Sequence, residues 1–512
     1  MSLEEQLNSI QNGEVSLISE YNEEYDDWYD DEEPYIYHDP EHITDTISSA
    51  CKLLHTLIDW EKYSEALNLA KTIFTLEVNV ENEYEDEVSL SFHDLFYYEL
   101  LSDDFEKIIL DMLYAAYMAT PISTRSEAVF QLMILSEWKE ISLEKLMQHS
   151  VRELPQLSEF LGYWTEFLCN QTGTLVENLL REAVNMMTDK EKQIQFAEKY
   201  CVTHPCIYEV LFQNQCFADA EEAVQNGRKA LTSIPEHYVI RSNIALMTAE
   251  YALVSEDTRC AEYCWLEAFR SNPTGTNLLR LMTMSNNFAD IENEVRKIIA
   301  YDYKTERQYS DYVPGKAKEL ISCYVSDNTR YTLLFFLGDY GEVLKNGMKI
   351  KKTLGWSDTF LKHGIPLFLL LMYNSATLDT ATKQMCKITL EYTEFNTLNY
   401  CRGTQLKKSE SKEVLFWKLF RQIRKSNNLS DEEQENIMDR LADLIEIRTE
   451  LIVSGQKRNY YNECATYIAA YGEVIEALGE TGFKQMLLSK YKSKYPRHSA
   501  FIRELKSFGL KC

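Results

Sequence analysis

Apolar residues recur at intervals of three and four along most of the chain from about His42 onward, and the alternating runs typical of strands are rare. This spacing gathers the apolar side chains on one face of an α-helix. Glycine (17) and proline (10) are few among 512 residues, which favours helices joined by short loops over a turn-rich β fold. The pattern therefore predicts an all-α protein, with a hydrophobic content of 45% to supply the core.

Two of the predicted helices repeat one arrangement of small residues ahead of a terminal proline: Ala223, Ala230 and Pro235 in the first, and Ala261, Ala268 and Pro273 in the second. The two prolines are 38 residues apart. Small residues at helical spacing let a neighbouring helix approach closely, and a proline ends the helix. A stack of helical hairpins is built in this way.

These residues resemble the tetratricopeptide repeat (TPR), whose second helix carries Ala, a bulky residue, Ala and a final Pro. The run LLFFLGDYGEVLKNG at 333–347 resembles the Gly-x-Tyr turn between the paired helices of that repeat. The resemblance implies a right-handed superhelical α-solenoid of TPR-like hairpins. In such arrays a partner peptide lies in the concave groove.

A longer resemblance covers about 155–285 and 458–508, which look like the helical region of bacterial proteins that also carry a SWIM-type zinc finger. That finger needs CxC followed by CxH, and this chain has neither. The resemblance therefore implies a large helical scaffold of bacterial type, and it implies neither zinc binding nor the nucleic-acid role of the finger.

Composition and loop residues divide the chain into five predicted segments. Residues 1–41 are an acidic, aromatic-rich leader, and 42–150 are an N-terminal helical block that contains a second acidic insert near its middle. The TPR-like repeats occupy 151–300, irregular helical repeats follow at 301–400, and a C-terminal helical block completes the chain at 401–512.

The leader contains the most unusual stretch, YNEEYDDWYDDEEPYIY at 21–37, with eight carboxylates and six aromatic residues in seventeen positions. Three interpretations stay open. The stretch could be disordered and keep the protein soluble, it could imitate nucleic acid, or it could be a docking element. In the docking interpretation aromatic side chains supply the affinity and the carboxylates pair with a basic rim on this chain or another. The aromatic residues would be Tyr25, Trp28, Tyr29, Tyr35 and Tyr37.

Charge is unevenly distributed. The formal net charge is −29, and residues 1–100 alone hold 26 acidic side chains against 3 lysines. Such a surface repels nucleic acid and anionic lipid. Basic residues gather at 345–352, 402–425 and 484–511, either as solvated helix faces or as partner contacts. Within the first of these segments we single out Lys349, Lys351 and Lys352.

Most of the 33 tyrosines recur at helical spacing and are expected in the core. Tyr460 and Tyr461, with Tyr467 and Tyr471, form a cluster that could instead line a groove for a partner. The sequence favours the core for this cluster and leaves the groove open as the alternative.

No catalytic motif is recognisable: the chain has no P-loop, no HExxH and no GxSxG. His38 and His42, the cysteines of 201–216, and the pair Cys260 and Cys264 carry metal-ligand types, but their spacing fits core or loop positions better than a metal site. We expect no catalytic residue, no cofactor and no metal.

The scattered cysteines indicate a reducing compartment, and MSLEEQLNSI at the N-terminus lacks the features of a signal peptide. The apolar run at 365–373 is too short for a bilayer and predicts a buried helix. We therefore expect a cytoplasmic protein without membrane contact.

The first function hypothesis is a non-enzymatic scaffold or adaptor that binds a protein or peptide in a TPR-like groove. The alternative is a peptide- or signal-responsive bacterial regulator. An enzyme with an unrecognised site and a nucleic-acid mimic rank below these two. The sequence does not predict the oligomeric state.

Overall fold

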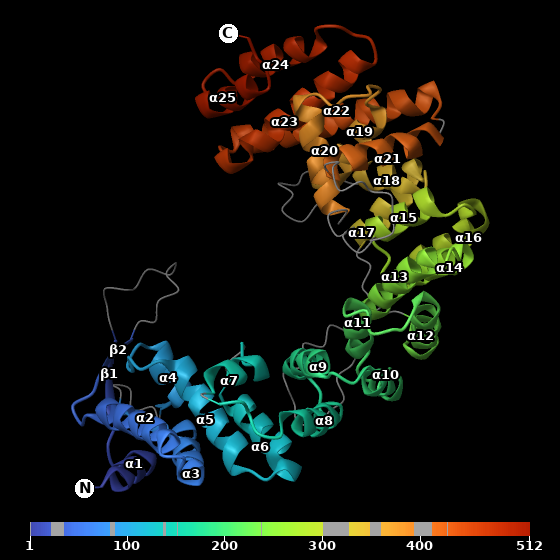
Figure 1. Ribbon diagram of the computed structural model, residues 1–512. Helices are drawn as coiled ribbons and strands as arrows, with labels where there is room; N and C mark the ends of the chain where they lie inside the picture. The colour runs from blue at the N-terminus through green and yellow to red at the C-terminus, as the bar shows by residue number, and fades with distance from the viewer. Residues whose placement is uncertain are drawn as a thin grey trace. The chain divides into compact units, whose positions relative to one another are not determined.

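The computed structural model describes residues 2–21, 35–81, 88–136, 140–150, 152–236, 238–300, 327–348, 360–393, 412–426 and 429–511. Within these ranges the chain is predominantly helical, as the spacing of its apolar residues predicts, and one small sheet accompanies the helices (Figure 1). The described residues divide into two compact units, one before and one after a boundary between Val210 and Leu211.

The first unit combines one sheet with short helices. Its elements are α1 (Leu3–Gln11), β1 (Leu17–Tyr21), β2 (Tyr35–His38), α2 (Ile43–Asp59), α3 (Tyr63–Phe74), β3 (Glu77–Glu81), β4 (Val88–Ser91), α4 (Phe92–Tyr97), α5 (Phe105–Ala119), α6 (Ile122–Leu135), α7 (Leu143–His149), α8 (Leu157–Leu168), α9 (Thr174–Met186) and α10 (Lys190–Lys199). Helix α11 (Cys206–Gln213) crosses the boundary between the units.

The sheet has the strand order β2-β1-β3-β4, with β1 antiparallel to β2 and parallel to β3. The helical pattern did not predict it. Each strand is only four or five residues long and adjoins an acidic run, so the alternation of buried Val78 and Val80 with exposed neighbours covers too few positions to stand out. Strands β1 and β2 fall within the predicted acidic leader, and β3 and β4 fall at the second acidic insert.

Polar side chains at helix starts fix where several helices begin. Ser91 and Asp94 form a capping box at the start of α4, and Asp104 accepts from the third backbone N–H of α5. Asp219 and Asp257 cap α12 and α14 in the second unit in the same way. Each cap contributes about 1 kcal/mol to the stability of its helix.

The core of the first unit surrounds α5, in which every residue from Ile108 to Tyr117 is buried. The Tyr117 hydroxyl donates to the Pro155 carbonyl, and the Arg125 guanidinium lies 4.4 Å from the centre of the Tyr117 ring. Because a helix that is buried on all sides needs neighbours on all sides, α2, α3, α6 and α7 pack around it.

The second unit is helical throughout its described residues. Its elements are α12 (Ala220–Ser233), α13 (Val239–Val254), α14 (Thr258–Ser271), α15 (Gly275–Met284), α16 (Phe288–Ala300), α17 (Asp327–Phe336), α18 (Tyr340–Met348), the π-helical turn η2 (Phe360–Gly364), α19 (Ile365–Met372), α20 (Thr380–Tyr392), α21 (Lys412–Ser426), α22 (Asp431–Ser454), the 3₁₀ turn η4 (Arg458–Tyr460), α23 (Tyr461–Ala477), α24 (Phe483–Lys494) and α25 (Ser499–Ser507).

Helices α11 to α16 follow one another along the chain, each separated from the next by a short connection (Figure 1). Alternate helices of this run, α11, α13 and α15, begin at Cys206, Val239 and Gly275, which are 33 and 36 residues apart. Helix α13 packs against both α12 and α14, and α14 packs against α15 and α16.

The small residues lie where these helices approach each other most closely. The four alanines predicted to allow close packing are fully buried. At Gly227 on α12, an added Cβ would lie 2.0 Å from the Thr248 hydroxyl on α13. Helices α12 and α14 end at Ser233 and Ser271, each two residues before its proline. The sequence pattern thus predicted both the packing surface and the ends of these helices.

The prediction of a buried helix at 365–373 is also confirmed, because α19 is buried along its whole length. In the portion of the chain that the structure describes, no helix is both long enough and apolar enough to cross a membrane.

Candidate partner-binding surfaces

The leader residues chosen for partner binding fall in two groups. Tyr35 and Tyr37 belong to β2, which pairs with β1 across the Ser19–Tyr37 and Tyr21–Tyr35 positions. Tyr25, Trp28 and Tyr29 lie outside the described residues. The two described tyrosines are therefore strand residues of a folded sheet.

Tyr37 lies beside two tyrosines that were not among the predicted site residues. Its ring centre is 5.0 Å from that of Tyr98, and the Tyr98 ring is 5.2 Å from Tyr97. Tyr97 is 63% exposed. The sequence offered one signal for this surface, which is the adjacent pair Tyr97 and Tyr98 at the end of α4. Two consecutive helical residues do not face the same core, so one of the two tyrosines should be exposed.

The other face of this sheet carries exposed isoleucines among carboxylates. Glu20 lies opposite Ile36, and Ile18 lies opposite His38 on β2 and beside Glu81 on β3. Ile36 is 46% exposed and Ile18 is 38% exposed. Apolar and acidic side chains thus alternate across three strands, and we call Ile18, Glu20, Ile36 and Glu81 the outer sheet face.

In the second unit, α15 and α13 differ in how much of their surface is exposed. On α15 every residue from Gly275 to Leu281 is buried, and the Thr276 hydroxyl donates to the Thr393 carbonyl at the end of α20. On α13, by contrast, Asn243 and Glu250 are half-buried and Val254 is 73% exposed. Helix α13 therefore leaves part of its surface accessible, whereas residues Gly275–Leu281 of α15 do not.

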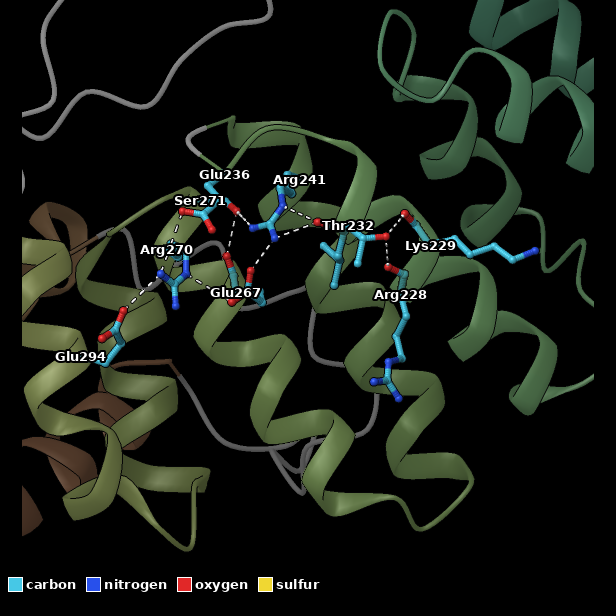
Figure 2. Close-up of polar contacts among 10 residues, drawn as sticks. Arg228, Lys229, Thr232, Glu236, Arg241, Glu267, Arg270, Ser271 and Glu294 are labelled. Atoms are coloured by element: carbon cyan, nitrogen blue, oxygen red, sulfur yellow. Dashed lines mark hydrogen bonds and ion pairs between the residues drawn. The ribbon is translucent and has the colours of Figure 1, made fainter.

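Figure 2 shows part of a polar network that joins four helices of this unit, α12, α13, α14 and α16. Arg241 on α13 is 3% exposed. Its guanidinium donates to the Leu231 carbonyl at the end of α12 at 2.9 and 3.1 Å, to the Ser271 hydroxyl at 2.7 Å and to the Glu267 carboxylate on α14. Glu267 also accepts from Arg270, which reaches Glu294 on α16 at 3.2 Å.

Asn277 on α15 bonds to the end of the preceding helix, as Arg241 does. Its side-chain amide donates to the Asn272 carbonyl, at the end of α14, at 2.8 Å. Arg241 and Asn277 are each the third residue of their helix, and each donates to a backbone carbonyl at the end of the preceding helix. These buried polar groups are accounted for by helix packing.

The three predicted lysines, Lys349, Lys351 and Lys352, lie outside the described residues. Several other basic residues have partners within the chain. Arg424 donates to the Tyr373 carbonyl at 2.8 Å, and Lys484 pairs with the buried Glu473 at 2.6 Å.

Lys494 pairs with both Glu446 and Glu450. The hydrogen bond from Lys494, with those from Tyr495 and Ser454, lowers the pKa of Glu450 to about 2. Some of the basic charge at the C-terminal end is therefore paired within the helical block itself.

Tyr461 is a core residue. It is buried, and its ring centre lies 5.6 Å from that of Phe501. Tyr467 is also buried, whereas Tyr460 is half-buried at the start of α23. Tyr461 and Tyr467 are therefore core residues, whereas Tyr460 and Tyr471 are half-buried and keep part of their surface exposed.

The first unit holds one buried carboxylate between two imidazoles. Asp111 on α5 lies 3.0 Å from His55 Nδ1 on α2 and 2.7 Å from His149 Nε2 on α7. An Asp–His pair can orient an imidazole for proton transfer. Within the described ranges, however, neither imidazole hydrogen-bonds a hydroxyl or thiol nucleophile, so the arrangement mainly joins three helices.

The histidines considered as metal ligands pair with carboxylates, and the two cysteines considered are buried. His38 lies 3.5 Å from Glu20, and His42 lies 3.0 Å from Asp45. A hydrogen bond with Cys264 lowers the pKa of Cys260 to about 7, but both thiols are buried. Among the described residues, no three His, Cys, Asp or Glu side chains are grouped so that they could hold a metal ion.

Comparison with known proteins leaves the fold and the surfaces above as the guide to function. No known protein family, curated protein or solved structure matches this chain.

Proposed function

We propose that this protein is a non-enzymatic scaffold or adaptor that binds a protein or peptide partner through a TPR-like groove. The observations that carry the proposal are the regular spacing of α11, α13 and α15 and the packing of α13 against both α12 and α14. Helices α11, α13 and α15 begin 33 and 36 residues apart, close to the spacing of the tetratricopeptide repeat. The proposal includes the right-handed solenoid that the resemblance implies.

The polar interior of these helices supports a structural role. Arg241, Glu267 and Asn277 are buried. Arg241 and Asn277 donate to carbonyl groups at the ends of α12 and α14, and Arg241 also pairs with Glu267. In an enzyme, buried polar side chains surround a reacting atom. In a repeat array, buried polar side chains hold neighbouring helices together. The proposed adaptor acts in the cytoplasm, which agrees with the buried free cysteines of the described residues.

The partner surface is proposed along α13, because residues Gly275–Leu281 of α15 are buried. Asn243, Glu250 and Val254 are spaced by seven and four residues and therefore lie on one face of the helix. The face is mixed in character, with an amide, a carboxylate and an apolar side chain. Such a face suits a short peptide that combines apolar contacts with hydrogen bonds.

Site-specific photocrosslinking tests this proposal. A benzophenone amino acid placed at Asn243 or at Val254 should crosslink one protein partner in cells, which mass spectrometry then identifies. The same group at Glu221, an exposed residue of α12, is the matched control. The proposal fails if both α13 positions give no crosslinked partner, or if Glu221 yields the same products as they do.

A further inference from the structure

We infer that the outer sheet face of the first unit is a second docking surface, and that it binds a basic, extended peptide segment of a partner protein. It lies in the first unit and is separate from the α13 face proposed above. The inference rests on the arrangement of Ile18, Glu20, Ile36 and Glu81 on three adjacent strands.

The register of the strands sets the geometry of this face. One row across the sheet contains His38, Ile18 and Glu81, and the next row contains Ile36 and Glu20. Neighbouring strands lie about 4.8 Å apart, so each isoleucine has a carboxylate as its nearest neighbour on the next strand. The face is a checkerboard of apolar and acidic side chains.

Lysine and arginine side chains match this checkerboard. Each has a long aliphatic stem and a cationic head, and the two ends prefer different surroundings. The stem can cover Ile18 or Ile36 while the head reaches Glu20 or Glu81. The Glu20 side chain can make such a contact because it is 63% exposed. His38 lies 3.5 Å from Glu20 on the same face of the sheet.

The position of β2 favours an extended partner. β2 is the terminal strand of the sheet. A segment that lies along β2 in an extended conformation projects every second side chain onto the outer sheet face, because side chains alternate along a strand. A partner with a basic residue at every second position would therefore satisfy several of these carboxylates at once.

Charge argues against the other possible occupants. The face carries the carboxylates of Glu20 and Glu81, and the chain has a formal net charge of −29. A second copy of this chain, a nucleic acid or an anionic membrane would each bring further negative charge to these carboxylates.

The test uses the full chain and a fluorescein-labelled peptide of four Arg-Thr repeats, with a peptide of four Glu-Thr repeats as the control probe. Fluorescence anisotropy at low salt should show binding of the basic probe alone. The variant E20Q/E81Q should bind about tenfold more weakly, because two charge contacts are lost. Ile36→Thr keeps strand propensity and should weaken binding several-fold through the lost apolar contact.

The matched control is E65Q/E159Q, which removes the same charge from exposed positions on α3 and α8. It should change the affinity by less than twofold. Equal losses in the two double variants would mean that the probe responds to net charge alone, and would overturn the inference. So would a failure of the wild-type chain to bind the basic probe. Dimerisation that Ile36→Lys abolishes would also overturn it, by assigning the face to a second copy.

Discussion

At the scale of single residues, His363 shows how burial sets the charge of a side chain. Its imidazole stacks on Tyr392 with ring centres 3.5 Å apart and planes 9° apart. Its Nδ1 atom is buried and makes no hydrogen bond within the described structure. Burial, and then the nearby charge of Lys362, lower the pKa of His363 to about 4. The ring is therefore neutral in the folded protein at pH 7.

This shift predicts a loss of stability in mild acid. Below the ordinary pKa of about 6.5, the unfolded chain binds a proton on His363 that the folded chain does not bind. The free energy of unfolding should thus fall as the pH drops from about 6.5 and level off near the folded pKa of about 4. Urea titrations of the wild type and of His363→Phe across this range would measure it.

Phenylalanine keeps the ring on Tyr392 but does not titrate, so the variant should lose less stability between neutral pH and pH 4 than the wild type. His93→Phe, which alters a histidine that lies 5.6 Å from the Phe105 ring in the first unit, is the control. Parallel pH profiles for the wild type and His363→Phe would contradict the prediction.

The candidate site residues show why single positions are hard to predict from a sequence. Tyr461 and Tyr97 are both tyrosines at helix ends, yet the first is buried and the second is exposed. The difference comes from α25, whose Phe501 covers Tyr461 from 40 residues further along the chain. Local spacing carries no information about such a distant neighbour.

At the scale of elements, Arg241 joins three helices and should be needed for their packing. Arg241→Met removes the donor from Leu231 and leaves the buried Glu267 carboxylate with less compensation. Breaking a buried pair in this way costs about 3–5 kcal/mol. Urea denaturation of the variant should show this loss in the free energy of unfolding.

Arg259→Met, an exposed change on α14, is the control and should cost less than about 0.5 kcal/mol. The double variant R241M/E267M should be less destabilised than the sum of the two single variants, because it removes both charges together. A strictly additive double variant would show that Arg241 and Glu267 do not interact as described.

Gly227 tests the close approach of α12 and α13. In an open helix, Gly→Ala stabilises by up to about 1 kcal/mol. Here the added methyl would lie 2.0 Å from the Thr248 hydroxyl, so Gly227→Ala should lower the melting temperature instead. Thr248→Ala in the same chain should restore some of the loss, since it removes the two nearest atoms.

The same substitution at Gly341 should change the melting temperature in the opposite direction. Gly341 lies in α18, and nothing is within 4 Å of a Cβ added there, so Gly341→Ala should raise the melting temperature. If Gly227→Ala were as stabilising as Gly341→Ala, helices α12 and α13 would have to be further apart than the structure places them.

The elements themselves were predictable to the extent that their signal is periodic. The alanines and prolines of α12 and α14 have a period that survives in the sequence, and the structure confirms the packing face and the helix ends. The sheet was not predictable, because its strands are short and flank acidic runs. Nor was the Arg241–Glu267 pair, since 26 residues separate its members and only the turn between α13 and α14 brings them together.

At the scale of the whole molecule, the charge is divided along the chain. Residues 1–100 carry a net charge of −23, and residues 401–512 carry a net charge of +5. Some of the C-terminal basic charge is paired with Glu446, Glu450 and Glu473 inside the helical block. The acidic excess of the first unit is thus the dominant long-range field of the protein, and it should attract cationic partners from a distance.

The outer sheet face combines this long-range field with a short-range apolar contact, and salt separates the two. Raising the ionic strength from about 0.02 M to 0.5 M shortens the Debye length from about 20 Å to about 4 Å. The association rate of the Arg-Thr probe should therefore fall steeply with salt. The affinity ratio between the wild type and E20Q/E81Q should approach one, because screening weakens the contact that the variant lacks.

The ratio between the wild type and Ile36→Thr should instead stay constant across the same salt range, since burial of an apolar side chain does not depend on a screened charge. Stopped-flow fluorescence and anisotropy at five salt concentrations would measure both ratios. If the Ile36→Thr ratio also fell to one at high salt, binding to this face would be purely electrostatic. The isoleucines would then contribute nothing to recognition, and the checkerboard of Ile18, Glu20, Ile36 and Glu81 would have no role beyond its charge.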